Sequence, residues 1–146
     1  MKKIILILTM IFVLTVPAFA STFRLPLFPS GTTITGTLSS ATSSVTYIQD
    51  ASNVEFVVTV GQPVGSASSL ALTINGTTDG SIFYTIPWIA TTREFPVTYT
   101  TTKALNVGTY YALIPTGIAP AIQVKLTGTI SGTDFYSVTG TLLGIK

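Results

Sequence analysis

The sequence contains no histidine and no cysteine. Without histidine, the chain cannot form a Ser-His-Asp triad, a Cys–His pair or a zinc site with an imidazole ligand. Without cysteine, it has no thiol nucleophile, no iron–sulfur cluster and no disulfide bond. These two absences exclude the commonest kinds of nucleophilic and metal-dependent catalysis, and they leave non-covalent packing and hydrogen bonds to stabilise the fold.

Charged residues are also scarce, with seven basic and five acidic side chains among 146 residues. Asp50, Asp79 and Asp134 lie in sequences typical of turns, where aspartate accepts hydrogen bonds from the backbone. Glu55 alternates with apolar residues and is expected to face outward. Asn75 and Asp79 could offer oxygens to Ca²⁺ from one loop, but such a site needs six to eight ligands, so the turn interpretation is preferred. We therefore expect no enzyme activity, no metal and no cofactor.

The first 20 residues have the three parts of a secretory signal peptide. Lys2 and Lys3 are the positive start, Ile4–Val16 is the apolar run, and Ala18–Ala20 matches a small-residue cleavage site. The run is shorter than the about 20 residues that a membrane-spanning helix needs. The pattern predicts cleavage after Ala20, Ser21 as the first mature residue, and a secreted, periplasmic or cell-surface protein with no stable membrane span after cleavage.

Cleavage changes the charge of the chain. Lys2 and Lys3 are two of the seven basic residues, so the remaining five balance the five acidic residues. A neutral chain lacks the basic surface that nucleic-acid binding requires, and we expect no nucleic-acid partner. The mature segment has 126 residues, which is the size of one domain.

No stretch of the mature chain keeps the 3.6-residue period of a helix, whereas alternation of apolar and other residues recurs. This alternation is typical of strands with one buried face, and glycine, asparagine and proline separate the segments. We predict an all-β fold, an antiparallel β-sandwich of about nine strands, after the N-terminal signal helix. The alternating segments are Val54–Val60, Leu70–Ile74, Ile82–Trp88, Phe95–Tyr99 and Ile122–Leu126.

Two segments resemble the bacterial pre-peptidase C-terminal (PPC-like) domains. Gly31–Leu38 is similar to the Gly-x-x-x-x-Gly-x-Leu opening strand of that family, and Leu105–Leu113 is similar to its late Gly-Thr-Tyr-Tyr strand. The resemblance covers residues 31–129 and implies a jelly-roll-like β-sandwich that is secreted, non-catalytic and associated with surface or substrate attachment. The chain departs from the family at Ser81–Tyr84, where acidic residues are usual, and this departure argues against a metal-binding role there.

The mature chain divides into an N-terminal segment, residues 21–30, and a sandwich domain, residues 31–146. In the first segment, Phe23, Leu25 and Leu27 alternate as they would in a strand. Such a segment either is donated to the sheet of a neighbouring copy or pairs within its own sandwich. Both alternatives remain open at this point.

Aromatic residues are the best candidates for a binding surface. Tyr84 and Trp88 have the same strand parity, and Tyr110 and Tyr111 lie next to each other on a later strand. Exposed rings could stack on sugars or anchor a protein partner, whereas buried rings would fill the core. For Trp88, core packing is the preferred interpretation.

The sequence thus predicts a secreted, non-catalytic β-sandwich module with a structural or surface-binding role. One alternative is a self-assembling surface or filament (pilus-like) subunit that donates residues 21–30. A second alternative is a carbohydrate-binding module with an aromatic platform. The expected partners are other copies of the chain, or a protein or polysaccharide of the cell surface.

Overall fold

The computed structural model describes residues 21–35, 40–61, 69–91, 98–129 and 135–146. Every regular element within these ranges is a β-strand, and none of them is a helix. The strands are β1 (Thr22–Thr35), β2 (Ser40–Thr42), β3 (Thr46–Tyr47), β4 (Asn53–Val60), β5 (Ser69–Thr77), β6 (Tyr84–Thr85), β7 (Trp88–Thr91), β8 (Thr98–Thr100), β9 (Thr102–Leu105), β10 (Gly108–Ile114), β11 (Ala121–Thr129) and β12 (Phe135–Ile145).

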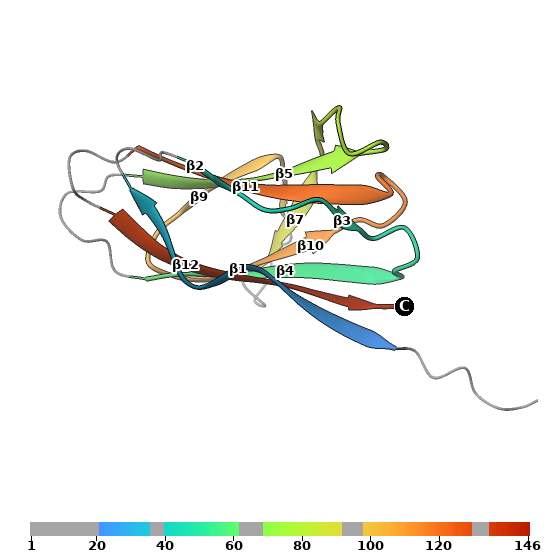
Figure 1. Ribbon diagram of the computed structural model, residues 1–146, viewed down its shortest axis with the longest axis horizontal. Coiled ribbons are helices and arrows are strands. Elements are labelled where there is room, and N and C mark those ends of the chain that lie inside the picture. The colour runs from blue at the N-terminus through green and yellow to red at the C-terminus, as the bar shows by residue number, and fades with distance from the viewer. Residues whose placement is uncertain (1–20, 36–39, 62–68, 92–97, 130–134) are drawn as a thin grey trace, which may run out of the picture.

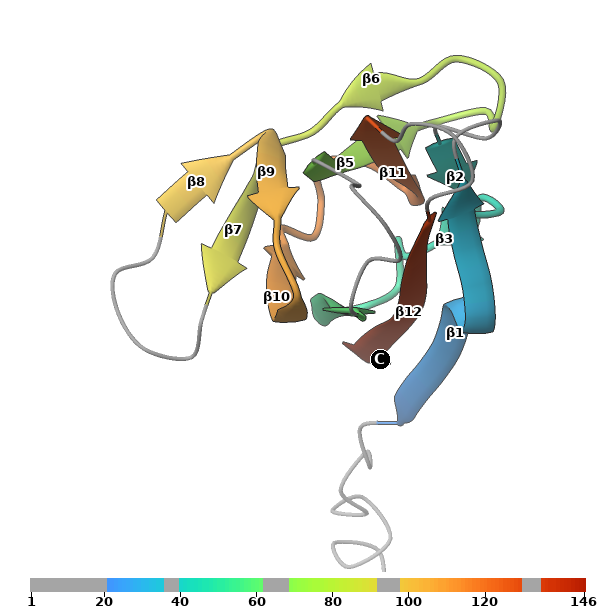
Figure 2. The ribbon, with the colours of Figure 1, turned by 90° about the vertical axis from the view of Figure 1, so that its left-hand side faces the viewer.

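The strands form two antiparallel sheets (Figures 1 and 2). The first sheet has the order β1-β12-β4-β10-β7-β8. The second sheet has the order β2-β11-β5-β6, with β3 paired to β11 and β9 paired to β5. The predicted all-β fold with antiparallel sheets is confirmed. The count exceeds the expected nine because strands of two to four residues, such as β3 and β6, are too short to show an alternation in the sequence.

The core lies between the two sheets and is built from the predicted alternation. Val54–Val60 and Leu70–Ile74 each bury every second side chain, as does Ile122–Leu126. Trp88 and Phe56 are the largest fully buried side chains. The inward rows of the two sheets meet in one contiguous cluster, because each sheet must cover its apolar face.

The prediction that Ile82, Tyr84, Ile86 and Trp88 share one strand face is wrong. Ile86 and Trp88 are buried, whereas Ile82 and Tyr84 are exposed. The chain turns here between two short strands, because β6 pairs with β5 in the second sheet and β7 pairs with β10 in the first. The alternation of side chains between the two faces of a strand therefore does not continue across this turn. The side chains of Phe95, Val97 and Tyr99, predicted to share another face, lie outside the described residues.

The N-terminal segment pairs within its own sandwich. β1 runs antiparallel to β12, from Thr22 opposite Ile145 to Thr35 opposite Phe135, with register shifts around Pro26 and Phe28. The ladder extends to Ser21, whose carbonyl accepts a 2.8 Å hydrogen bond from the backbone N–H of Lys146. In the single chain, residues 21–30 therefore form one strand with the first residues of the domain that was expected to begin at Gly31.

The predicted signal peptide, residues 1–20, lies outside the described residues. Among the residues that the structure does describe, no helix is long and apolar enough to cross a membrane.

Candidate interaction surfaces

The four aromatic residues of the predicted platform do not form a common surface. Trp88 is only 1% exposed and lies in the core. Its indole Nε1 is buried without a hydrogen-bond partner among the described residues. A side chain in this position cannot stack on an external ligand, so the core interpretation of Trp88 is correct.

Tyr110 and Tyr111 project to opposite faces of β10. Tyr110 is half-buried against the core, and its hydroxyl accepts a 2.7 Å hydrogen bond from the backbone N–H of Asn106. Tyr111 is half-buried on the other face, where it lies opposite Val57 of β4 and Thr91 of β7. Tyr84 belongs to the second sheet. The predicted platform is therefore wrong as a unit, because its members come from different sheets and different faces.

The three residues of the predicted donated strand have different surroundings. The ring of Phe23 packs on Gly144 of β12, where a Cβ atom would clash with it. Leu27 is partly buried against the core, and Leu25 is 40% exposed. The single chain thus uses two of the three residues for its own packing.

Tyr84 instead belongs to an exposed cluster that the sequence did not reveal. Ile82, Phe83, Tyr84 and Ile118 are 37% to 72% exposed and lie at the same end of the sandwich, on the loop that leads into β6, on the first residue of β6 and on the loop before β11. These segments are linked by a 3.2 Å hydrogen bond from the Tyr84 hydroxyl to the carbonyl of Ile118. We call these four residues the apolar tip. Exposed apolar side chains that are grouped in this way mark interaction sites more often than single ones do.

The backbone that carries the apolar tip is fixed by Asp79. Its Oδ1 atom accepts hydrogen bonds from the backbone N–H groups of Ser81 and Ile82, at 2.8 and 2.9 Å. The buried Thr77 hydroxyl donates to the same oxygen at 3.2 Å and accepts from the N–H of Gly80 at 2.9 Å. The bond from Ile82, followed by that from Ser81, lowers the pKa of Asp79 below its ordinary value of 3.8 because each favours the ionised form. The carboxylate is thereby committed to the turn.

Gly76 allows the Tyr84 ring to lie close to the sheet. A Cβ atom at Gly76 would be 2.7 Å from Ala119, 2.8 Å from Ile86 and 3.0 Å from the Tyr84 ring. The ring of Tyr84 is therefore held on two sides, by the strand below it and by its hydrogen bond to Ile118.

The outward faces of the two sheets differ in chemistry. The second sheet presents mainly polar residues, and Thr73 and Asn75 of β5 lie opposite Lys125 and Gln123 of β11. The first sheet presents a band of half-buried apolar side chains, for which we use the term open face: Val57, Ile89, Tyr111, Leu113 and Leu143. The outward side of a solvated antiparallel sheet is ordinarily polar. The open face departs from that pattern.

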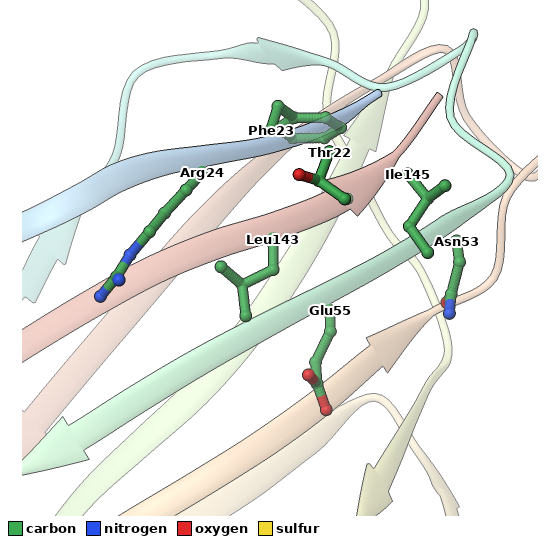
Figure 3. A pocket seen from close by; sticks show the side chains of 8 residues that line it. Thr22, Phe23, Arg24, Asn53, Glu55, Leu143 and Ile145 are labelled. Atoms are coloured by element: carbon green, nitrogen blue, oxygen red, sulfur yellow. The ribbon is translucent and has the colours of Figure 1, made fainter. Parts of the chain in front are cut away.

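A shallow hollow of about 450 Å³ lies at one end of the open face (Figure 3). Leu143 projects into it from the middle strand β12, and Arg24 of β1 and Glu55 of β4 stand on either side. A second hollow, of about 320 Å³, continues from Arg24 and Leu143 toward Val57 and Tyr111. Both are open depressions with mixed linings, because Thr22 and Asn53 also line the first hollow, and Thr59, Thr139 and Thr141 also line the second.

The described residues hold no group of three or more acidic side chains that could bind a metal ion. Glu55 lies on the open face as the sequence predicts, opposite Leu143 and Leu113.

Comparisons with known proteins relate the chain to others by fold. No protein-family model matches the chain, and no curated protein matches it. Among solved structures, the crystal structure of the SPBc2 prophage-derived protein YomS is similar, with a TM-score of 0.54 and 14% sequence identity. The match covers 90% of this chain and 99% of that one. At 14% identity, the similarity supports the all-β architecture and gives no indication of function.

Proposed function

We propose that the chain is exported and acts outside the cytoplasm as a non-catalytic module that binds a partner through the apolar tip. The observation that carries this proposal is the exposure of Ile82, Phe83, Tyr84 and Ile118, on chain segments that hydrogen bonds hold together. A preformed apolar surface loses little conformational entropy when it binds, so most of the burial contributes to affinity.

The signal-like segment that ends at Ala20 supports export. Ser21, the expected first mature residue, takes part in the backbone ladder between β1 and β12. We expect Edman sequencing of the exported protein to begin at Ser21, and an intact N-terminus at Met1 would contradict the export proposal.

The binding role is tested by making the apolar tip polar. Ile82→Ser and Phe83→Ser together should shift the exported protein from the cell-surface fraction to the medium, because the exposed apolar contacts are lost. Val107→Ser is the matched control. Val107 is 46% exposed and lies at the opposite end of the sandwich, next to Gly108, which pairs with Val60 at the far end of β4. Equal distribution of the double variant and the unchanged chain would overturn the proposal.

The similarity to PPC-like domains stays a prediction, and it points to the same kind of attachment role. A polysaccharide partner is less favoured than a protein or lipid surface, because the row of four stacked rings that it would need is not formed.

A further inference from the structure

On the open face of the first sheet, one leucine stands between two opposite charges. Leu143 of β12 lies directly opposite Arg24 on one neighbouring strand and Glu55 on the other (Figure 3). Adjacent strands are about 4.8 Å apart, so the two charged residues lie at equal distances on either side of Leu143. Within the described part of the chain, no ion pair joins the Arg24 guanidinium to the Glu55 carboxylate.

Apolar side chains extend from this row along the same face. Leu113 of β10 lies beyond Glu55, and Ile145 follows Leu143 on β12. Val57 and Tyr111 form the next row. The band thus combines these apolar side chains with one positive and one negative group, and threonines such as Thr141, opposite Val57, border it. Covering its apolar side chains with a partner is favourable.

We propose that a second copy of this chain covers the open face, related to the first by a two-fold axis that runs along β12 between the stacked sheets. Rotation about this axis exchanges the two sides of β12. Arg24 of each copy then faces Glu55 of the other, and Leu143 faces its own counterpart. The contact uses the same patch on both copies, as two-fold interfaces do, and the sheets stack at the usual separation of about 10 Å.

The charges select both the partner and the axis. A ligand for this face needs a negative group opposite Arg24, an apolar group opposite Leu143 and a positive group opposite Glu55, and the inverted face of a second copy has that order. An axis along β4 would stack Glu55 on Glu55, and an axis along β1 would stack Arg24 on Arg24. Like charges that face each other across an interface are strongly unfavourable. Only the axis along β12 pairs opposite charges.

A charge-reversal series tests the pairing directly. Sedimentation velocity of the exported chain at increasing micromolar concentrations should show a monomer–dimer equilibrium. Arg24→Glu and Glu55→Arg should each raise the dissociation constant at least about tenfold, since each creates two like-charge pairs. The double variant Arg24→Glu/Glu55→Arg should return it to within about threefold of the unchanged chain, because the reversed pairs attract again.

Lys125→Glu is the matched control. It reverses one charge on the outward face of the second sheet, where Lys125 lies opposite Thr73, and should leave the equilibrium unchanged. A monomer at every concentration would overturn the proposal. So would a double variant that is as weak as the single variants, or a Lys125→Glu variant that is equally weakened.

A cysteine introduced at the axis gives a second readout that does not depend on charge. The chain has no cysteine of its own, so Leu143→Cys would carry one thiol that faces its counterpart in the dimer. Backbones about 10 Å apart are too distant for a disulfide, so the probe is a short bis-maleimide that bridges two facing thiols. It should cross-link this variant within the dimer, and Lys125→Cys should stay uncross-linked. Equal cross-linking of the two variants would contradict the proposed axis. The apolar tip lies outside this interface, so Ile82→Ser/Phe83→Ser should still dimerise, which separates this proposal from the proposed function.

Discussion

Asp79 shows how one side chain can override the alternation of a strand. Its carboxylate accepts hydrogen bonds from the backbone N–H groups of Ser81 and Ile82, and this turn lies between β5, which ends at Thr77, and β6, with which β5 pairs. Ile82 then points to solvent, although its position in the sequence predicts a buried face. The sequence did carry a usable signal, because Asp79 and Gly80 are favoured turn residues and aspartate commonly caps the N–H groups that follow it.

The Asp79 turn predicts a specific dependence of stability on pH. The pKa of Asp79 is lower in the folded chain than its ordinary value of 3.8. The ionised group therefore stabilises the fold above that value, and the contribution is lost as the pH falls through the lower folded pKa. Asp79→Asn should abolish this part of the acid destabilisation, measured as the urea midpoint between about pH 5 and pH 2.

Asp50→Asn is the control for this measurement, because Asp50 is an exposed aspartate in another turn. It should leave the loss of stability in acid unchanged. The same acid dependence in Asp79→Asn and in the unchanged chain would show that the turn does not depend on the charge.

At the scale of the element, β1 closes one edge of the first sheet. Phe28 is buried and makes an edge-to-face contact with Phe56, with ring centroids 6.2 Å apart. Gly140 of β12 makes this contact possible, because a Cβ atom there would be 2.7 Å from both rings. The strand is thus attached by an aromatic pair as well as by its backbone ladder. The sequence indicated the strand, but it did not show whether the strand pairs in its own chain.

The attachment of β1 predicts unequal costs for two truncations in the same strand. Phe28→Ala should lower the free energy of unfolding by about 3–5 kcal/mol, because it removes a buried ring and leaves a cavity. Leu25→Ala should lower it by less than about 1 kcal/mol, since Leu25 is 40% exposed. Urea titration followed by circular dichroism measures both. Equal losses would mean that β1 does not pack on the core through Phe28.

At the scale of the whole molecule, strands that are distant in the sequence pair side by side in the first sheet. β12 is the last strand, and it lies between β1, the first, and β4. The last two strands, β11 and β12, belong to different sheets, so the second sheet is completed only by β11 and the first only by β12. A topology dominated by distant pairs folds slowly and loses its structure as a unit.

This topology predicts one cooperative unfolding transition. Trp88 is the single tryptophan and is buried in the first sheet, so its fluorescence reports on the core. Its emission should shift to the red at the same urea concentration at which the far-ultraviolet circular dichroism of both sheets is lost. Acrylamide should quench it little before that point. A fluorescence transition at a lower urea concentration would show that the first sheet opens independently.

The sequence by itself determined the fold class and the chemistry that the chain lacks. Alternation in Val54–Val60, Leu70–Ile74 and Ile122–Leu126 depends only on neighbours along the chain, and composition excludes residue types outright. The tertiary structure decided which side chains meet. Tyr84 and Trp88 separate into different sheets, and Arg24 and Glu55 come to flank Leu143. Such juxtapositions depend on the register between strands from distant parts of the chain, and that register follows from packing across the whole core rather than from any local pattern.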